Sequence, residues 1–173
     1  MEIKGSQFTL RTWRAADAPS LQKHANNPKV VACLLDRFPT PYTLADAEFF
    51  INLNLHQDPV TNFAIEINGE VAGVIGLDFR DDVYSKSPLI GYWLSEQYWG
   101  RGIIPEAVKL VTDYGFKKLD IICIMAFVFS TNPKSMRVLE KAGYVQQAVL
   151  KQSVIKNGVV LDEHVYVAYR NNV

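Results

Sequence analysis

The spacing of apolar side chains predicts a chain that alternates between strands and helices. Strands are expected where apolar and polar residues alternate, or where a short apolar run ends in turn residues. They cover residues 8–13, 63–67, 71–79, 89–94, 121–129, 144–155 and 159–169. Helices are expected where apolar residues recur at the helical period behind a capping residue or an early proline. They cover residues 17–26, a short piece after residue 28, and residues 43–55, 103–119 and 133–141.

Turn residues define the connections between these elements. Asn68-Gly69 and Asn157-Gly158 each predict a tight hairpin between two strands. The segment Asp36–Tyr42 contains two prolines, which exclude regular structure and stiffen an aromatic loop. The uninterrupted apolar run of residues 121–129 is expected to form a fully buried strand.

The order of the elements indicates a mixed α/β sheet. The strand 89–94, the helix after it and the strand 121–129 are expected to form a right-handed crossover with two parallel strands. No repeat, linker or charge block divides the sequence, so residues 1–173 are interpreted as a single domain. Ligands of such sheets gather at the carboxyl ends of parallel strands, which here means residues 94–102.

Composition and charge exclude several classes of protein. Lys plus Arg and Asp plus Glu both number 18, so the chain lacks the positive excess that nucleic-acid phosphates require. The longest apolar run is far shorter than the roughly 20 residues of a membrane-spanning helix. The N-terminus has no export signal, so we expect a cytoplasmic protein with neither nucleic acid nor membrane as a partner. Cysteines and histidines are scattered, so no metal site is expected.

The strongest candidate for chemistry lies between the strand 89–94 and the next helix, where residues 97–102 read Gln-Tyr-Trp-Gly-Arg-Gly. The two glycines let backbone N–H groups converge on one point, and the helix start adds partial positive charge. A diphosphate fits such a turn, and Arg101 can add a contact at its rim. A tight turn with nothing bound is the alternative. A P-loop needs Gly-Lys-Ser/Thr here, and a dinucleotide fingerprint needs a small residue in place of Pro105, so neither motif matches.

The same residues match Gln/Arg-x-x-Gly-x-Gly/Ala, the acetyl-CoA signature of the GNAT acyltransferase superfamily, at each defined position. The chain also resembles the RimJ/RimL branch at residues 90–94, at residues 132–144 and at Leu10-Arg11, in the right order. This resemblance implies a single-domain GNAT fold, a mixed and mostly antiparallel sheet whose central parallel pair is flanked by helices. It further implies acetyl-CoA as the cosubstrate, with no metal.

The resemblance also implies the contacts that hold the cofactor. Trp93 and Leu94 are expected to contact pantetheine, and Asn132 and Ser135 the thiol end. Contacts to the pyrophosphate are expected from Gln97, Tyr98, Trp99, Gly100, Arg101, Gly102 and Ile103. From the residues alone, Trp93 also fits a core position, and Asn132 before Pro133 fits a helix N-cap equally well.

The implied reaction is direct attack of an amine on the acetyl thioester, which needs oxyanion donors, a base and an acid for the thiolate. Many family members place a Tyr acid where Leu139 stands, whereas the RimJ/RimL branch is expected to use Ser135. The Glu that some branch members carry on a late strand is Val154 here, so the base is open. Asp36 is favoured because prolines fix its loop. The remaining candidates are water, Asp78, Glu163 and His164.

The acceptor is expected to be a protein or peptide N-terminal α-amine. Two alternatives stay open: acetylation of a small-molecule amine such as an antibiotic, polyamine or amino acid, and a weakly catalytic CoA-binding module. Phe38, Tyr42 and Tyr84 predict an aromatic opening on the acceptor side, with ordinary loop residues as the alternative. The protein is expected to be a monomer or a homodimer.

Overall fold

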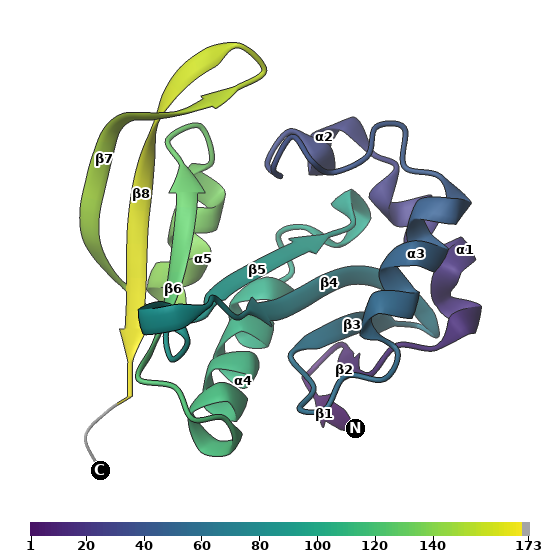
Figure 1. The fold of residues 1–173 in the computed structure, drawn as a ribbon. Helices are drawn as coiled ribbons and strands as arrows, with labels where there is room; N and C mark the ends of the chain where they lie inside the picture. The colour runs from purple at the N-terminus through teal and green to yellow at the C-terminus, as the bar shows by residue number, and fades with distance from the viewer. Residues whose placement is uncertain (171–173) are drawn as a thin grey trace. The chain divides into compact units, whose positions relative to one another are not determined.

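The computed structural model describes residues 1–170, and its helices and strands follow the predicted order (Figure 1). The described residues form two compact units, residues 1–76 with 92–107, and residues 77–91 with 108–170. Three elements contribute residues to both units. They are β4 (Glu70–Asp78), β5 (Leu89–Leu94) and α4 (Ile103–Lys118).

The first unit contains antiparallel strands and the carboxyl half of β5. Strands β1 (Glu2–Lys4), β2 (Thr9–Arg11) and β3 (Asn62–Ile67) precede β4, in the order β1-β2-β3-β4-β5. The predicted Asn68-Gly69 turn joins β3 to β4, with both residues at positive φ. The sequence pattern does not predict β1, because three residues are too few to show an alternation.

Close backbone packing places β5 beside β4 in the first unit. A Cβ on Gly73 of β4 would lie 2.5 Å from the carbonyl oxygen of Trp93, so only glycine permits this approach. Just after β5, the Ser95 amide donates to the carbonyl oxygen of Ala72 at 2.8 Å. The backbone of β4 therefore positions the end of β5, where the site is expected.

Helices α1 (Ala18–Ala25), α2 (Pro28–Val31) and α3 (Leu44–Asn54) confirm the three predicted early helices. Thr43 begins α3 with a capping box, because its hydroxyl accepts from the Asp46 amide while the Asp46 carboxylate accepts from the Thr43 amide. Helices α1 and α3 lie side by side in Figure 1. The core of this unit includes Trp13, Ala18, Leu21, Ala25, Tyr42, Ala47, Ile51, Ala64, Val71 and Val74.

A buried ion pair fastens β2 to the segment before α1. The Arg11 guanidinium donates two hydrogen bonds to Asp17, at 2.7 and 2.8 Å, and both side chains are almost fully buried. Glu66 of β3 also accepts from Arg11. Hydrogen bonding to Asp17 is the main cause that raises the pKa of Arg11, so the guanidinium stays charged in the interior.

The second unit contains the amino half of β5 and three further strands. Strands β6 (Cys123–Phe129), β7 (Val145–Lys156) and β8 (Val159–Tyr169) follow the order β5-β6-β8-β7. The parallel β5–β6 pair is confirmed by the register of Leu89 with Met125. The hairpin of β7 and β8 is also confirmed. Figure 1 shows it as the yellow-green β7 beside the yellow β8.

The prediction of a fully buried strand at residues 121–129 is wrong. In β6, Ile124, Ala126 and Val128 are buried, whereas the alternate positions are partly exposed and Phe127 is 39% exposed. The Ile124 side chain packs near Gly115 of α4, which covers its face of the strand. A parallel strand is often covered on both faces, and this strand is well covered on only one.

The later helices are also as predicted. Helix α5 (Pro133–Lys141) begins after Asn132 and ends before Gly143, which has φ +90°. Helix α4 confirms the long helix expected after residue 103. Within residues 1–170, no helix is long and apolar enough to cross a membrane.

Candidate functional site

The turn from β5 into α4 has the backbone geometry that its glycines predict. Gly100 and Gly102 both have φ +78°, a conformation that L side chains rarely adopt. A Cβ built on either glycine would meet no atom within 4 Å, so this backbone is open to an approaching ligand. Because α4 begins at Ile103, the N–H groups of its first two residues have no acceptor within the helix, and Pro105 has no N–H. The turn therefore presents backbone donors at the positive end of a helix dipole.

Side chains of the first unit hold this turn in place. The Trp99 indole donates to the carbonyl oxygen of Leu94 at 2.7 Å, which closes the loop on the end of β5. The Arg101 guanidinium lies 5.2 Å from the Tyr98 ring centroid and donates to the Gln97 carbonyl oxygen at 3.0 Å. Arg101 is thus ordered at the rim, where its charge can reach an anion.

The N-terminal segment supports the start of α4. Ser6 donates to the Glu106 carboxylate through its amide at 2.8 Å and through its hydroxyl at 2.6 Å. The Gln7 side chain donates to the Arg101 carbonyl oxygen at 3.3 Å. These contacts orient the first turn of α4 from outside the helix.

A hollow of about 460 Å³ lies beside the end of β5 in the first unit. Its lining residues are Lys23, His24, Asn27, Ser95, Glu96 and Gln97. Buried His24 is 3.0 Å from the Ser95 hydroxyl through Nδ1 and 3.1 Å from the Glu70 carboxylate through Nε2. Hydrogen bonds from Lys23, and then from His24, lower the pKa of Glu70.

The sequence pattern gives no sign of this Glu70–His24–Ser95 chain. His24 and Ser95 are separated by 71 positions, and no local motif connects them. In the sequence, His24 has no functional residue near it. In the folded chain, its side chain connects α1 to Ser95, the residue that follows β5.

In the second unit, the turn from β6 into α5 carries the side chains predicted for the thiol end. Asn132 is the N-cap of α5, and its side-chain oxygen accepts from the Ser135 amide at 3.2 Å. The Asn132 amide donates to the Phe129 carbonyl oxygen at 2.8 Å. Leu139, one turn further along α5, is fully buried. A tyrosine side chain in place of Leu139 would therefore extend from a buried position in the core. Ser135, in contrast, is half-buried on the first turn of α5.

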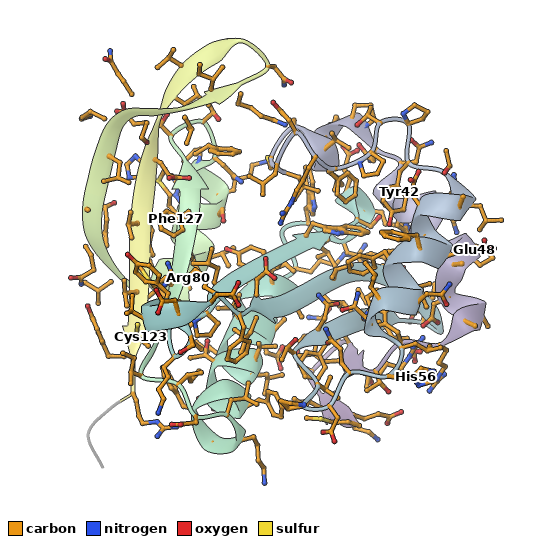
Figure 2. The ribbon with its side chains drawn as sticks, viewed as in Figure 1. Tyr42, Glu48, His56, Arg80, Cys123 and Phe127 are labelled. Carbon is orange, nitrogen blue, oxygen red and sulfur yellow. The ribbon has the colours of Figure 1, made fainter. Side chains whose placement is uncertain are left out.

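The structure corrects one part of the predicted aromatic opening. Tyr42 is 5% exposed and stacks on Phe38, with ring centroids 4.9 Å apart, so it belongs to the core rather than to a rim (Figure 2). Burial raises its pKa to about 12. Asp36, the predicted base, lies exposed on the loop before these rings.

Tyr84 belongs to the second unit and is half-exposed beside Arg80. The Arg80 guanidinium lies 4.7 Å from the Tyr84 ring centroid and donates to the Ser87 carbonyl oxygen at 2.7 Å and to Met125 Sδ at 3.3 Å. Figure 2 shows Arg80 near Cys123 at the start of β6. Burial raises the pKa of the Cys123 thiol, as expected for a small structural side chain.

The remaining candidates for the base have different surroundings. Asp78 is exposed at the end of β4. His164 of β8 is 3.1 Å from the Gln146 side-chain oxygen through Nδ1. Glu163, next to it, is half-buried, and burial raises the pKa of its carboxyl group. Within residues 1–170, no group of three or more His, Cys, Asp or Glu residues is arranged to hold a metal ion.

Comparison with known proteins finds several acetyltransferases that are similar to this chain. YjcK from Bacillus subtilis, a probable N-acetyltransferase, is 44% identical over 80 residues, which cover 46% of this chain and 44% of YjcK. The chain thus spans less than half of that relative's length. Spermidine N(1)-acetyltransferase from Escherichia coli is 26% identical over 122 residues, 70% of this chain and 65% of that protein.

A solved structure shows that the fold is shared along the whole chain. Ribosomal-protein-S5-alanine acetyltransferase from Vibrio fischeri superposes with a TM-score of 0.86 at 20% identity, covering 99% of this chain and 98% of that one. The family described as acetyltransferase (GNAT) domain matches residues 7–145, which include both strand-to-helix turns. The chain therefore belongs to the GNAT acetyltransferase family.

Proposed function

We propose that the protein transfers an acetyl group from acetyl-CoA to a primary amine. The observation that carries this proposal is the turn at Gly100 and Gly102, where the space around both glycines is open and helix α4 begins with N–H groups that have no acceptor within the helix. Membership of the GNAT family gives this turn its expected ligand, the CoA pyrophosphate.

The proposed cofactor contacts divide between backbone and side chains. The backbone of Trp93 and Leu94 would bind pantetheine, and residues 97–103 would bind the pyrophosphate, with Arg101 adding charge. The contact between β4 and β5 at Gly73 supports the first part, because it fixes the β5 backbone independently of any side chain. Asn132 and Ser135 would lie toward the thiol end.

The chemical step requires the protein to manage two protons. The attacking nitrogen must lose a proton, and the departing sulfur must gain one. We propose Ser135 as the donor to sulfur, because the Asn132 cap holds the first turn of α5 and Leu139 is too buried to be the acid's position. Asp36 stays a prediction for the base. It is exposed, so solvent screens its charge.

The proposed acceptor is a protein or peptide N-terminal α-amine. The Vibrio fischeri neighbour, whose name specifies a ribosomal-protein alanine, supports a protein acceptor. The similarity to spermidine N(1)-acetyltransferase favours the second candidate, a small-molecule amine. The nonpolar Leu139 and Val154, at two places where relatives carry catalytic groups, favour the third, a CoA-binding module.

One assay separates these three functions. Thiol release from acetyl-CoA is measured with peptides of different N-terminal residues, with spermidine and with amino acids, beside calorimetry with CoA alone. Faster release with peptides supports the first candidate, and faster release with spermidine supports the second. Saturable CoA binding without release for any amine would leave only the binding module.

A further inference from the structure

Three consecutive ionisable residues on β8 have unequal surroundings. The Asp162 carboxylate accepts from Lys151 Nζ at 2.8 Å and from the Gln152 amide at 2.9 Å, and the bond from Lys151 is the main cause that lowers its pKa. His164 contacts Gln146. No hydrogen bond or ion pair reaches the Glu163 carboxylate from any part of residues 1–170, although it is half-buried.

The strand register places Glu163 among apolar neighbours. It pairs with Phe129 of β6 on one side and with Leu150 of β7 on the other. Directly opposed residues of an antiparallel pair share a face, so Glu163, Phe129 and Phe127 point the same way. Figure 2 shows Phe127 on β6.

Helices cover the opposite face of these strands. Tyr166 of β8 donates to Glu140 of α5 at 3.0 Å, and Ile124 of β6 packs near Gly115 of α4. Successive side chains of a strand point to opposite faces, so His164 and Tyr166 share one face of β8 and Glu163 lies on the other. Glu163 is therefore on the face away from α4 and α5. Among the described residues, the Glu163 carboxylate has no cation beside it on this partly apolar face, so no ion pair offsets the cost of burying its charge.

Glu163 also lies beside the turn that carries the proposed acid. Its pairing partner Phe129 is the last residue of β6, and the Phe129 carbonyl oxygen accepts from the Asn132 amide. The Ser130 amide donates to the carbonyl oxygen of Asp162 at 2.9 Å, which fixes the turn against β8. Asn132 in turn accepts from the Ser135 amide. A short series of bonds therefore joins the part of β8 that carries Glu163 to the first turn of α5, which carries Ser135.

We propose that Glu163 is the general base of the transfer reaction, taking over the role that Val154 on β7 cannot perform. This inference rests on the proposed function. As the amine nitrogen forms its bond to the acetyl carbon, Glu163 accepts one proton from that nitrogen, directly or through one water. The carbon–sulfur bond breaks, and Ser135 supplies one proton to sulfur. Transfer of the Glu163 proton back to Ser135 through solvent restores both groups, so protons balance.

The chemistry of the carboxyl group suits this role better than that of Asp36. Burial penalises the charged form, so the pKa of Glu163 lies above its usual range. A base is more effective as its pKa approaches the working pH. Asp36 is exposed and lies on a loop of the first unit, whereas Glu163 is held by hydrogen-bonded strands on both sides.

The test compares Glu163→Gln, which keeps the size of the side chain, with Glu163→Asp and Asp36→Asn. We expect Glu163→Gln to lower kcat/KM about 100-fold while CoA affinity, measured by calorimetry, stays within about twofold. In the wild type, kcat/KM should fall at acidic pH as Glu163 is protonated, and this acid limb should vanish in Glu163→Gln. Glu163→Asp should retain part of the activity. Asp113→Asn, on the exposed face of α4, is the matched control and should leave the rate unchanged.

Stability provides a readout that does not depend on turnover. A raised carboxyl pKa contributes stability below the unfolded value of about 4.3, and this stability is lost as pH rises through the folded value. At neutral pH the charged Glu163 is therefore unfavourable, and Glu163→Gln should melt at the same temperature as the wild type or higher. If Glu163 instead stabilised the fold, the Glu163→Gln variant would have a lower melting temperature than the wild type.

The outcomes separate the two proposals. An unchanged rate and an unchanged acid limb in Glu163→Gln, with an active wild type, would overturn the assignment of Glu163. If the fall of kcat/KM at acidic pH disappeared in Asp36→Asn but not in Glu163→Gln, the general base would be Asp36 and not Glu163. A wild type that binds CoA but acetylates no amine would overturn the proposed function, and the base assignment with it. A carboxyl pKa of Glu163 at the ordinary value, measured by NMR, would overturn the assignment of Glu163 and leave the proposed function intact.

Discussion

The two strand-to-helix turns of this protein begin their helices in opposite ways. Helix α5 begins with Asn132, whose side chain satisfies the Ser135 amide, so the helix caps itself. Helix α4 begins after Gly102, which has no side chain to offer as a cap, so the N–H groups of Ile103 and Ile104 have no acceptor within the helix. The first kind of turn presents side chains for chemistry, and the second presents backbone for binding. We therefore expect substitutions in the α4 turn to change affinity and substitutions in the α5 turn to change rate.

The largest effect is expected at Gly100. Gly100→Asp places a carboxylate against the proposed diphosphate, and repulsion of about 4 kcal/mol would weaken CoA binding about 1,000-fold. Calorimetry with CoA measures this change. Gly69→Asp is the matched control, because Gly69 has a similar φ of +82° in the turn between β3 and β4. Equal loss of affinity in both variants would mean that strain, and not charge at the site, is responsible.

The α5 turn should respond in rate. Ser135→Ala removes the proposed proton donor, and we expect kcat to fall about 100-fold while the affinity for CoA changes little. Ser85→Ala, at an exposed serine of the second unit, should leave both parameters unchanged. If Ser135→Ala raised the KM for acetyl-CoA with kcat unchanged, the two turns would not differ as proposed.

A smaller effect is expected where the N-terminal segment supports α4. Glu106→Ala removes both hydrogen bonds from Ser6, which should destabilise the protein by about 1 kcal/mol and weaken CoA binding up to about fivefold. Thermal melts and calorimetry measure the two changes. Lys109→Ala on the same helix is the control, and a matching loss there would attribute the effect to helix stability alone.

The smallest effect is expected at His24. His24→Gln keeps one hydrogen bond of the Glu70–His24–Ser95 chain at most, so the residue after β5 is held less firmly. We expect the KM for acetyl-CoA to rise about threefold with kcat unchanged. His56→Gln, at an exposed histidine labelled in Figure 2, should have no effect. A change in kcat at His24 would place that residue in the chemical step.

The sequence predicts the α4 turn well because its chemistry is local. Gly100 and Gly102 are next to the strand and helix that they join, and positive φ follows directly from residue type. The surroundings of Glu163 are not local. They depend on which residues of β6 and β7 stand opposite it, and the irregular register of β7 between Leu150 and Val154 cannot be read from the letters.

Two predictions failed for a related reason. Composition shows that the strand 121–129 and Tyr42 are apolar or aromatic, but it does not show how many sides of each are covered. β6 has one well-covered face, and Tyr42 is enclosed by its neighbours. Burial depends on packing between distant segments, so pattern analysis locates elements more reliably than it assigns their exposure.

Gly73 has a consequence for attempts to broaden the range of acyl donors. Its missing side chain lets the strand that would guide pantetheine approach the neighbouring backbone directly, with no adjustable atom between them. Libraries that diversify this position would mostly push the two strands apart and lose the donor altogether.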